Sequence, residues 1–409
     1  MNIVLRLAWR NIWRHPRRTW LTTGAMVFSN SLLVFMMSIQ FGMYDLMINN
    51  TLQSFSGHLQ VQAPGYKDDL KMRQSVPDVR VLAATFREDS GFENVAARGG
   101  AFALASSEER SYGVQIYGVE PAFEPGVSNI PGLVKEGRFL GDLNATEVVI
   151  GKVLARNLRV GIGDELTLLG SGRDGSFAAA IVSIVGIFDS RIPEMDRGIA
   201  EIPLGLFQDT FAMDGAGHQL VITTAELSRV PAAKQAAHQL LPVESDLVVH
   251  DWEALQPGLK QAIQADLASA WFMYGLLVIL VAFSVMNTQL MSVLERTKEF
   301  GIVMSLGLTP GRLGRLVMLE TALMGFMGLL LGALVGAIVT TWFTFNGFAY
   351  PGMDELAANF NLPARIYPGV TFGTLIAGPA VVFAGTLAAA LYPALRLHWL
   401  QPVEAMRAA

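Results

Sequence analysis

Residues 295–309 read ERTKEFGIVMSLGLT, and Pro310 follows them. Charged residues gather in the first third of this stretch, apolar residues dominate the remainder, and long hydrophobic segments flank it on both sides. Because ionised side chains are costly inside a bilayer, a charged helix between two membrane spans must lie at the membrane surface, within reach of soluble proteins. The stretch therefore predicts a membrane protein that a partner drives from outside the bilayer.

The composition of the chain also favours a membrane protein. Its 409 residues are 52% hydrophobic and only 16% charged, and the mean hydropathy is +0.39. Soluble proteins carry about 25% charged residues. The chain contains no cysteine, which excludes disulfides and cysteine-ligated zinc.

Four segments are long and apolar enough to cross a bilayer, which takes about 20 residues in a helix. They are residues 20–48, 269–294, 316–345 and 369–391. A cleaved signal peptide is the alternative for the first segment. Its apolar run is too long for a signal peptide and no small-residue cleavage site follows it, so we expect a retained span.

Charge is distributed unevenly around these spans. Residues 49–268 hold 28 acidic and 18 basic residues, a net charge of −10, so the rest of the chain carries +5 of the total −5. Arginine and lysine gather before the first span, between the second and third, and after the fourth, and such residues mark the cytoplasmic side. We therefore expect residues 346–368 to form a short periplasmic loop, residues 392–409 to form a cytoplasmic tail, and both termini to be cytoplasmic.

The first residues have the pattern of an amphipathic helix. Arginines recur every four residues on one face, and two tryptophans lie among the apolar residues of another face. A basic helix of this kind favours the headgroup layer of the membrane. We expect residues 1–16 to form this cytoplasmic-interface helix; the alternative is a plain basic flank. The apolar face consists of Leu5, Ala8, Trp9, Ile12 and Trp13.

Residues 49–268 are long enough for one or two compact subdomains outside the membrane. Short strand patterns alternate with helix patterns, and strands are denser at about residues 140–210. The expected fold class is membrane α-helical, with four transmembrane helices and a large α+β extracytoplasmic domain inserted between the first and second. The region near 140–210 is expected to be a β-rich insertion in that domain.

The chain resembles the FtsX-like permease family, the membrane subunits of MacB- and LolCDE-type ABC transporters. Residues 295–310 are similar to the family signature E-R-x-x-E-[FI]-G-x-x-x-[AS]-[LM]-G, and PVEAMR at 402–407 is similar to its closing P-x-E-A-[LM]-R. Residues 149–164 resemble a strand–helix–G-x-G-D segment of the family. LAWRN at 7–11 and GHLQV at 57–61 are most similar to the LolC/LolE branch, and to LolE in particular.

The resemblance implies a dimer of permeases, either two copies of this chain or this chain with a paralogue, that carries two cytoplasmic ABC ATPases. Residues 295–309 would be the coupling helix that contacts the ATPase. The alternative for this stretch is a solvated loop, which its ordered apolar half argues against. The expected coupling residues are Glu295, Arg296, Lys298, Glu299, Phe300, Gly301, Leu306 and Gly307.

The chain lacks the G-x-x-x-x-G-K-[ST] motif of an ATP-binding loop. We therefore expect that it binds no cofactor, and that the partner ATPase binds ATP and magnesium. Its six histidines are scattered, with no metal-ligand or nucleophile motif. The sequence predicts no catalytic residue, no metal site and no role for nucleic acid.

Glu320 is expected about one turn inside the third span, where an ionised group is usually paired. Its partner could be Arg296, Arg312 or Arg315, or its carboxylate could reach the membrane surface instead. A proton-transfer role is not expected because no second acid or histidine accompanies it.

Three glycines recur at four-residue intervals in the third span. This spacing lets two membrane helices approach closely, so we expect a packing role. They are Gly328, Gly332 and Gly336.

Methionine and phenylalanine are frequent in the first two spans. Flexible methionines suit acyl chains of variable shape, and a substrate cleft between subunits is one interpretation; lipid-facing or helix-packing surface is the other. The candidates are Met36, Met37, Phe41, Met43, Met47, Phe272 and Met273.

The cargo implied by the resemblance is a lipoprotein or another lipidated molecule of the bacterial inner membrane. One alternative is a mechanotransmitter or efflux permease that acts on a periplasmic partner protein. Another is a membrane-anchored interaction protein without an ATPase. The turn at residues 170–176 is too short for the extended hook with which one type of lipoprotein-releasing permease recruits a chaperone, which makes chaperone docking by this chain doubtful.

Overall fold

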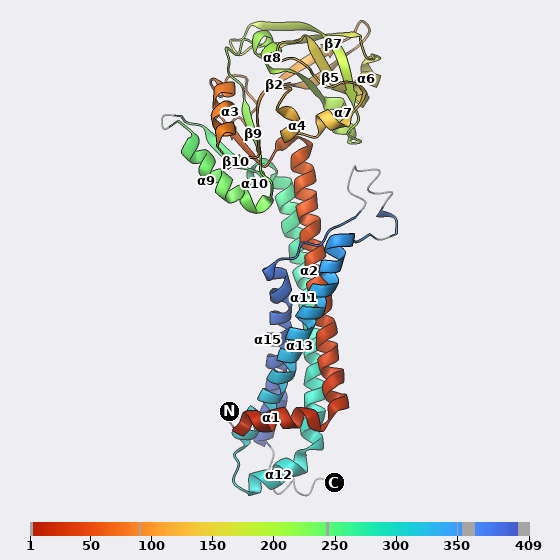
Figure 1. Ribbon diagram of the computed structural model, residues 1–409, viewed down its shortest axis with the longest axis vertical. Coiled ribbons are helices and arrows are strands. Elements are labelled where there is room, and N and C mark those ends of the chain that lie inside the picture. The colour runs from red at the N-terminus through yellow and green to blue at the C-terminus, as the bar shows by residue number, and fades with distance from the viewer. Residues whose placement is uncertain (1–2, 90, 243–244, 350, 354–364, 400–409) are drawn as a thin grey trace. The chain divides into compact units, whose positions relative to one another are not determined.

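The computed structural model describes residues 3–89, 91–242, 245–349, 351–353 and 365–399. The chain divides into two compact units (Figure 1). The first unit comprises Met1–Asp45, Ala262–Tyr350 and Arg365–Ala409, and the second comprises Leu46–Gln261 and Pro351–Ala364.

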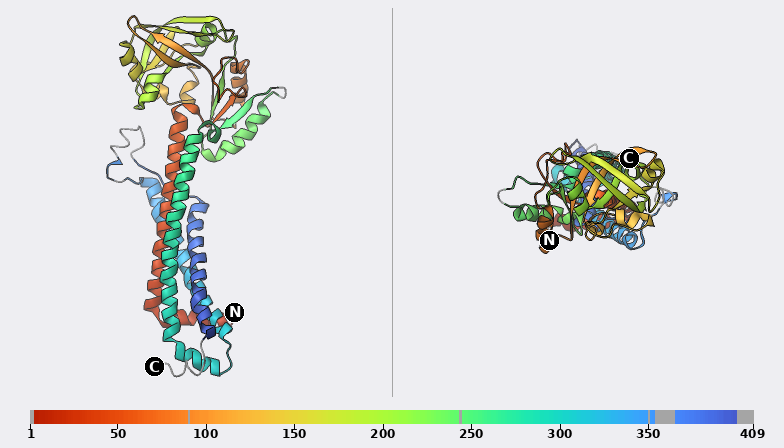
Figure 2. Two further views of the ribbon diagram at one scale, coloured as in Figure 1. Left: turned by 180° about the vertical axis from the view of Figure 1, so that it is seen from behind. Right: turned by 90° about the horizontal axis from the view of Figure 1, so that it is seen from above.

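The first unit is helical, and four helices of the described chain are long and apolar enough to cross a membrane. α2 and α11 run side by side, as two opposite views show (Figures 1 and 2). Each helix except α15 begins before the expected span, because the helical pattern continues into less apolar sequence. The four helices are α2 (Pro16–Thr51), α11 (Pro257–Glu295), α13 (Pro310–Asn346) and α15 (Phe372–Arg396).

Two short helices, α1 (Ile3–Arg14) and α12 (Thr297–Ser305), lie at one end of this bundle (Figure 1). α1 packs its buried Ala8 and Ile12 inward, as its amphipathic pattern requires. α12 stops where Gly307 adopts a φ of +97°, a left-handed conformation that favours glycine. The charged stretch of the sequence is therefore a helix and not a loop.

The second unit is built on one ten-stranded sheet. Along its main path the order is β10-β1-β9-β2-β3-β8-β5-β7-β4, and β6 pairs with β2 and β7. The strands are β1 (Leu59–Gln62), β2 (Asn94–Ser106), β3 (Ser111–Val119), β4 (Val134–Gly137), β5 (Glu147–Gly151), β6 (Glu165–Ser171), β7 (Phe177–Phe188), β8 (Ile199–Pro203), β9 (Gln219–Thr223) and β10 (Val248–Asp251).

The strands of the expected insertion at 140–210 do not form a sheet of their own. β8 pairs with β3, and β6 pairs with β2, so they continue the sheet that begins outside this region. Helices pack around the sheet and complete its core. They are η1 (Leu52–Ser56), α3 (Val79–Glu88), α4 (Glu124–Val127), α5 (Ile130–Leu133), α6 (Lys152–Leu158), α7 (Pro193–Gly198), α8 (Leu204–Thr210), η2 (Leu227–Arg229), α9 (Val230–Leu240) and α10 (Trp252–Leu255).

Parts of two expected segments fall outside the described residues. In the loop expected at 346–368, Phe348 pairs with Ile366 through a β-bridge, while residues 350 and 354–364 are not described. In the tail expected at 392–409, the description ends at residue 399. The PVEAMR segment at 402–407 therefore lies outside the described residues.

Candidate functional site

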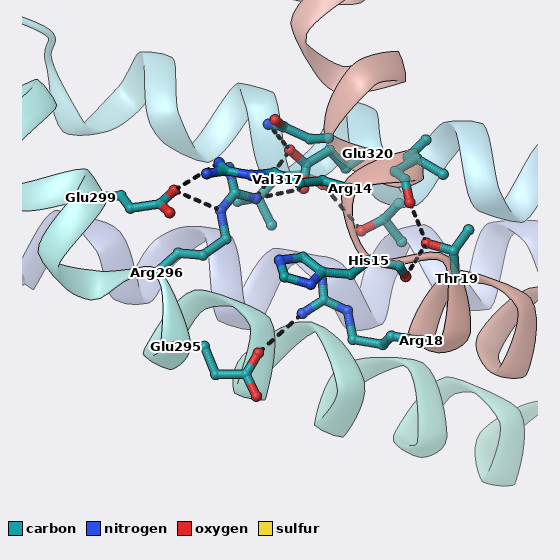
Figure 3. Close-up of polar contacts among 12 residues, drawn as sticks. Arg14, His15, Arg18, Thr19, Glu295, Arg296, Glu299, Val317 and Glu320 are labelled. Carbon is teal, nitrogen blue, oxygen red and sulfur yellow. Dashed lines mark hydrogen bonds and ion pairs between the residues drawn. The ribbon is translucent and has the colours of Figure 1, made fainter.

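Glu320 of α13 joins three elements at one end of the helical unit (Figure 3). Its carboxylate oxygens lie 3.2 and 3.3 Å from Nη1 of Arg296, the residue that precedes α12. Nδ2 of Asn11 on α1 donates a hydrogen bond of 2.6 Å to the same carboxylate. The Glu320 side chain is 6% exposed. Of the three arginines expected as partners, Arg296 is therefore the one that pairs with it.

Two further ion pairs tie the start of the charged stretch to α1 and α2 (Figure 3). Nη1 of Arg14 lies 3.3 Å from Glu299, and Nη1 of Arg18 lies 3.4 Å from Glu295. Both glutamates are about half exposed. Exposed pairs of this kind contribute about 0–1 kcal/mol each, so they orient the helix more than they stabilise it.

The inner face of α12 is apolar and packed. Phe300 is 3% exposed and Met304 is 8% exposed, and the Arg296 guanidinium lies 4.9 Å above the Phe300 ring. Gly301 is also buried. Phe300 and Met304 belong to a cluster formed by α11, α12, α13 and the residues after α15, with Val293, Leu313, Val317 and Leu397 as its other buried members.

The eight expected coupling residues therefore have different positions. Arg296, Phe300 and Gly301 lie on the side of α12 that packs against the bundle. Lys298, Leu306 and Gly307 are exposed, and Glu295 and Glu299 are exposed but paired. The sequence-based prediction omitted Ile302 and Leu308 from this set, although they are 54% and 40% exposed. Lys298, Ile302 and Leu306 recur at four-residue spacing, a signal that could have found this outer face.

The three glycines of α13 lie against α2. A Cβ atom added at Gly328 would lie 2.6 Å from Met26, and one at Gly332 would lie 2.4 Å from Asn30. At Gly336 it would lie 2.8 Å from Val34. All three distances are shorter than Cβ atoms tolerate, so this stretch of α13 touches α2 through its backbone.

The residues considered for a substrate cleft divide into two groups. Met37 is 4% exposed and packs near Gly378 of α15, so it is part of the helix packing. Met47 is partly buried. The others are exposed to between 38% and 76%: Met36, Phe41, Met43, Phe272 and Met273.

A buried charge cluster in the second unit was missed by the sequence reasoning. Arg98 of β2 and Glu124 of α4 are both fully buried and form a two-point ion pair. Nη1 of Arg98 also donates a hydrogen bond of 2.5 Å to the carbonyl of Phe55 in η1. The sequence feature that could have indicated this cluster is a single arginine inside an otherwise uncharged strand, NVAARGGAFALAS.

Glu201 of β8 lies beside this pair, and neither of its oxygens has a hydrogen-bond partner among the described residues. Burial, together with the negative charge of Glu124, raises the pKa of the Glu201 carboxyl well above its ordinary value of 4.5. An acid with a raised folded-state pKa stabilises the fold at low pH, and this stability is lost as the pH rises above the unfolded value.

We therefore expect Glu201 to lower the unfolding temperature of the second unit more at pH 8 than at pH 5, and Glu201→Gln to remove this pH-dependent contribution. Thermal unfolding of the full chain in detergent at pH 5 and pH 8 measures both. Glu226→Gln, which alters an exposed acid of the same unit, is the control. Equal pH dependence in Glu201→Gln and wild type would contradict the prediction.

No group of three or more His, Asp or Glu side chains that could hold a metal ion occurs within the described residues. Residues 271–402 match the FtsX-like permease C-terminal family, and residues 19–240, more than half of the chain, match the MacB-like periplasmic core domain. The chain belongs to the FtsX-like permeases with a MacB-like periplasmic core domain.

The family and fold class expected from the sequence are thus confirmed, and the chain is an ABC transporter permease. The lipoprotein-releasing system transmembrane protein LolC of Xylella fastidiosa is 27% identical over 320 residues, 73% of the permease and 74% of LolC. The lipoprotein-releasing system transmembrane protein LolE of Haemophilus influenzae is 25% identical over 325 residues, which are 74% of the permease and 74% of LolE. Among solved structures, the permease is similar to the periplasmic region of MacB from Actinobacillus actinomycetemcomitans. The match covers 52% of the permease and 95% of the MacB structure, with 12% identity and a TM-score of 0.38.

Proposed function

We propose that this permease couples ATP hydrolysis by a separate cytoplasmic ATPase to motion of its periplasmic domain, and that it releases lipoproteins or other lipidated molecules from the bacterial inner membrane. The similarity to LolC and LolE, both named as parts of lipoprotein-releasing systems, supports this cargo. The partner ATPase binds ATP and magnesium. A second copy or a paralogue completes the dimer, and both termini are cytoplasmic.

The two faces of α12 carry the proposal. Its inner face is fixed by Phe300, Met304 and the Arg296–Glu320 pair, so the helix is not a freely moving loop. Its outer face presents Lys298, Ile302 and Leu306, with Leu306 79% exposed. A rigid helix with exposed apolar side chains suits docking into a groove of another protein. Force applied there passes directly to α11 and α13, which α12 connects.

Replacing Leu306 with aspartate is expected to reduce the affinity for the ATPase at least about tenfold, because an apolar anchor becomes a charge at the interface. The exposed side chain makes little contribution to the fold, so the variant should remain folded. The measurement is the molar ratio of ABC ATPase to permease after gentle purification of tagged protein, read by mass spectrometry.

Phe102→Asp provides a matched control, because Phe102 is an apolar side chain of the second unit that is 72% exposed. It should retain the ATPase at the wild-type ratio. An unchanged ratio in Leu306→Asp would contradict docking through α12. Lipoproteins or lipidated molecules in the same preparation support the cargo, whereas a stoichiometric periplasmic protein without lipid would favour a mechanotransmitter.

A further inference from the structure

A cavity of about 390 Å³ lies at the corner where α1 turns into α2. Five consecutive residues, 14–18, and one acid from the end of α11 line it. Figure 3 shows four of these residues: Arg14, His15, Arg18 and Glu295. The volume is in the range of small-ligand sites. The lining residues are Arg14, His15, Pro16, Arg17, Arg18 and Glu295.

The charge of this cavity is unbalanced. Three arginines and one glutamate line it, and Glu299 pairs with Arg14 from outside the lining, which leaves a net charge of +1 with His15 neutral. Arg17 has no ion-pair partner in the described part of the chain. The pairs of Arg14 and Arg18 with glutamates are 3.3 and 3.4 Å long and partly exposed, so both arginines can turn toward a stronger acceptor. Arginine binds phosphate through paired, charge-assisted hydrogen bonds, so a phosphate group fits this lining.

Apolar surface continues from the cavity in two directions. Trp9, Trp13 and Trp20 form a chain of edge-to-face contacts with ring centroids 5.9 and 6.1 Å apart, and all three are at least 40% exposed. Exposed tryptophans at the end of a membrane helix lie at the headgroup level of a bilayer. The cavity is therefore placed where lipid headgroups lie.

One face of α2 extends this apolar surface toward the bilayer interior. Arg17, Trp20, Leu21, Gly24 and Phe28 share that face by their spacing. Leu21 is 76% exposed and Phe28 is 70% exposed, and a Cβ atom added at Gly24 would meet nothing within 4 Å. The face is an open apolar track that begins at the basic cavity.

We propose that this corner binds an anionic phospholipid, with the phosphate in the arginine cavity and one acyl chain along the α2 track. The track favours a lipid over free phosphate, because free phosphate would make no apolar contact with the exposed Leu21 and Phe28. The inference does not depend on which cargo the permease handles. Since Arg14 also pairs with Glu299 of α12, a bound headgroup would compete for that arginine and weaken the ion pair between α1 and α12.

The test uses the full chain in detergent micelles, with retained lipid counted by native mass spectrometry. Phosphatidylglycerol should be retained in preference to phosphatidylcholine. Each arginine near an anionic headgroup changes the affinity about fivefold, so Arg14→Gln with Arg17→Gln should reduce phosphatidylglycerol retention by more than tenfold. The control is Arg6→Gln with Arg10→Gln, which removes two exposed arginines of α1 outside the cavity and should leave retention near the wild-type value.

Gly24→Phe tests the acyl track without altering the charge, and it should weaken phosphatidylglycerol retention while the arginines remain. Equal retention of the two lipids, or equal losses in the cavity and control variants, would overturn the proposal. So would displacement of phosphatidylglycerol by inorganic phosphate at matched concentration, which indicates a free-phosphate site. Because the chain has no cysteine, rapid disulfide-linked dimerisation of Gly24→Cys would show that a second copy covers the track.

Discussion

Replacing Gly332 with leucine is expected to destabilise the helical unit by at least about 3 kcal/mol, the upper part of the usual cost of overpacking a core. A Cβ atom at this position would lie 2.4 Å from Cβ of Asn30 and 3.0 Å from the carbonyl oxygen of Val27. These are the stem of a side chain and the backbone of α2, so no flexible group can yield and the helices must separate. The hydrogen bond of 3.0 Å from Nδ2 of Asn30 to the Gly328 carbonyl would then lengthen and weaken as well.

The measurement is the unfolding temperature and the monodisperse fraction of the purified permease in detergent. Gly275→Leu is the matched control, because Gly275 also lies in a long apolar helix, α11, and a Cβ atom there would meet nothing within 4 Å. It should unfold close to the wild-type temperature. If both leucine variants unfold at the same lowered temperature, close packing of α13 on α2 is not the cause.

The four long helices and the short charged helix could be predicted because the signals are local. Hydrophobic length marks a span wherever it lies in the fold, and charge marks the surface. The α+β class of the second unit could be predicted for a similar reason, since strand and helix patterns alternate along the chain. Its single continuous sheet could not, because pairing such as β3 with β8 joins segments about 80 residues apart.

The side chains of the candidate site were predicted less completely. Three arginines lie near Glu320 in sequence, and only the folded geometry selects Arg296. Phe300 and Ile302 are both apolar, so a nine-residue helix gives little indication of which one faces inward. Which residue faces inward depends on the packing partners of Phe300, and one of them, Leu397, lies near the C-terminal end of the described chain.

Arg98→Met is expected to destabilise the second unit by about 3–5 kcal/mol, the cost of removing one partner from a buried ion pair. Arg98 and Glu124 are both 0% exposed, and Nε of Arg98 donates a hydrogen bond of 3.1 Å to Oε2 of Glu124. Without the guanidinium, the buried Glu124 carboxylate has no ion-pair partner among the described residues. The measurement is the free energy of unfolding of the second unit, obtained by pulse proteolysis of the full chain in urea.

Two comparisons make this expectation specific. Arg138 and Glu147 form another arginine–glutamate pair of the same unit, but the Arg138 side chain is 56% exposed. Arg138→Met should therefore cost less than about 1 kcal/mol. Adding Glu124→Leu to Arg98→Met removes the carboxylate that lost its partner and should recover much of the lost stability. Equal costs for Arg98→Met and Arg138→Met would show that burial of the first pair is not decisive.

The position of Arg98 gives the same substitution a consequence for transport. The last turns of α2 continue into η1, where the carbonyl of Phe55 accepts the hydrogen bond from Arg98 and the Phe55 ring lies 4.2 Å below its guanidinium. The Phe55 ring also lies 4.4 Å from that of Tyr117 on β3. Under the proposed function, movement of the end of α2 would be passed to β2 and β3 through this contact. In the variant carrying both Arg98→Met and Glu124→Leu, where stability is largely recovered, we expect the ATPase to remain bound and active while cargo release is reduced. Release at the wild-type rate by that folded variant would show that the contact holds the unit together without transmitting motion.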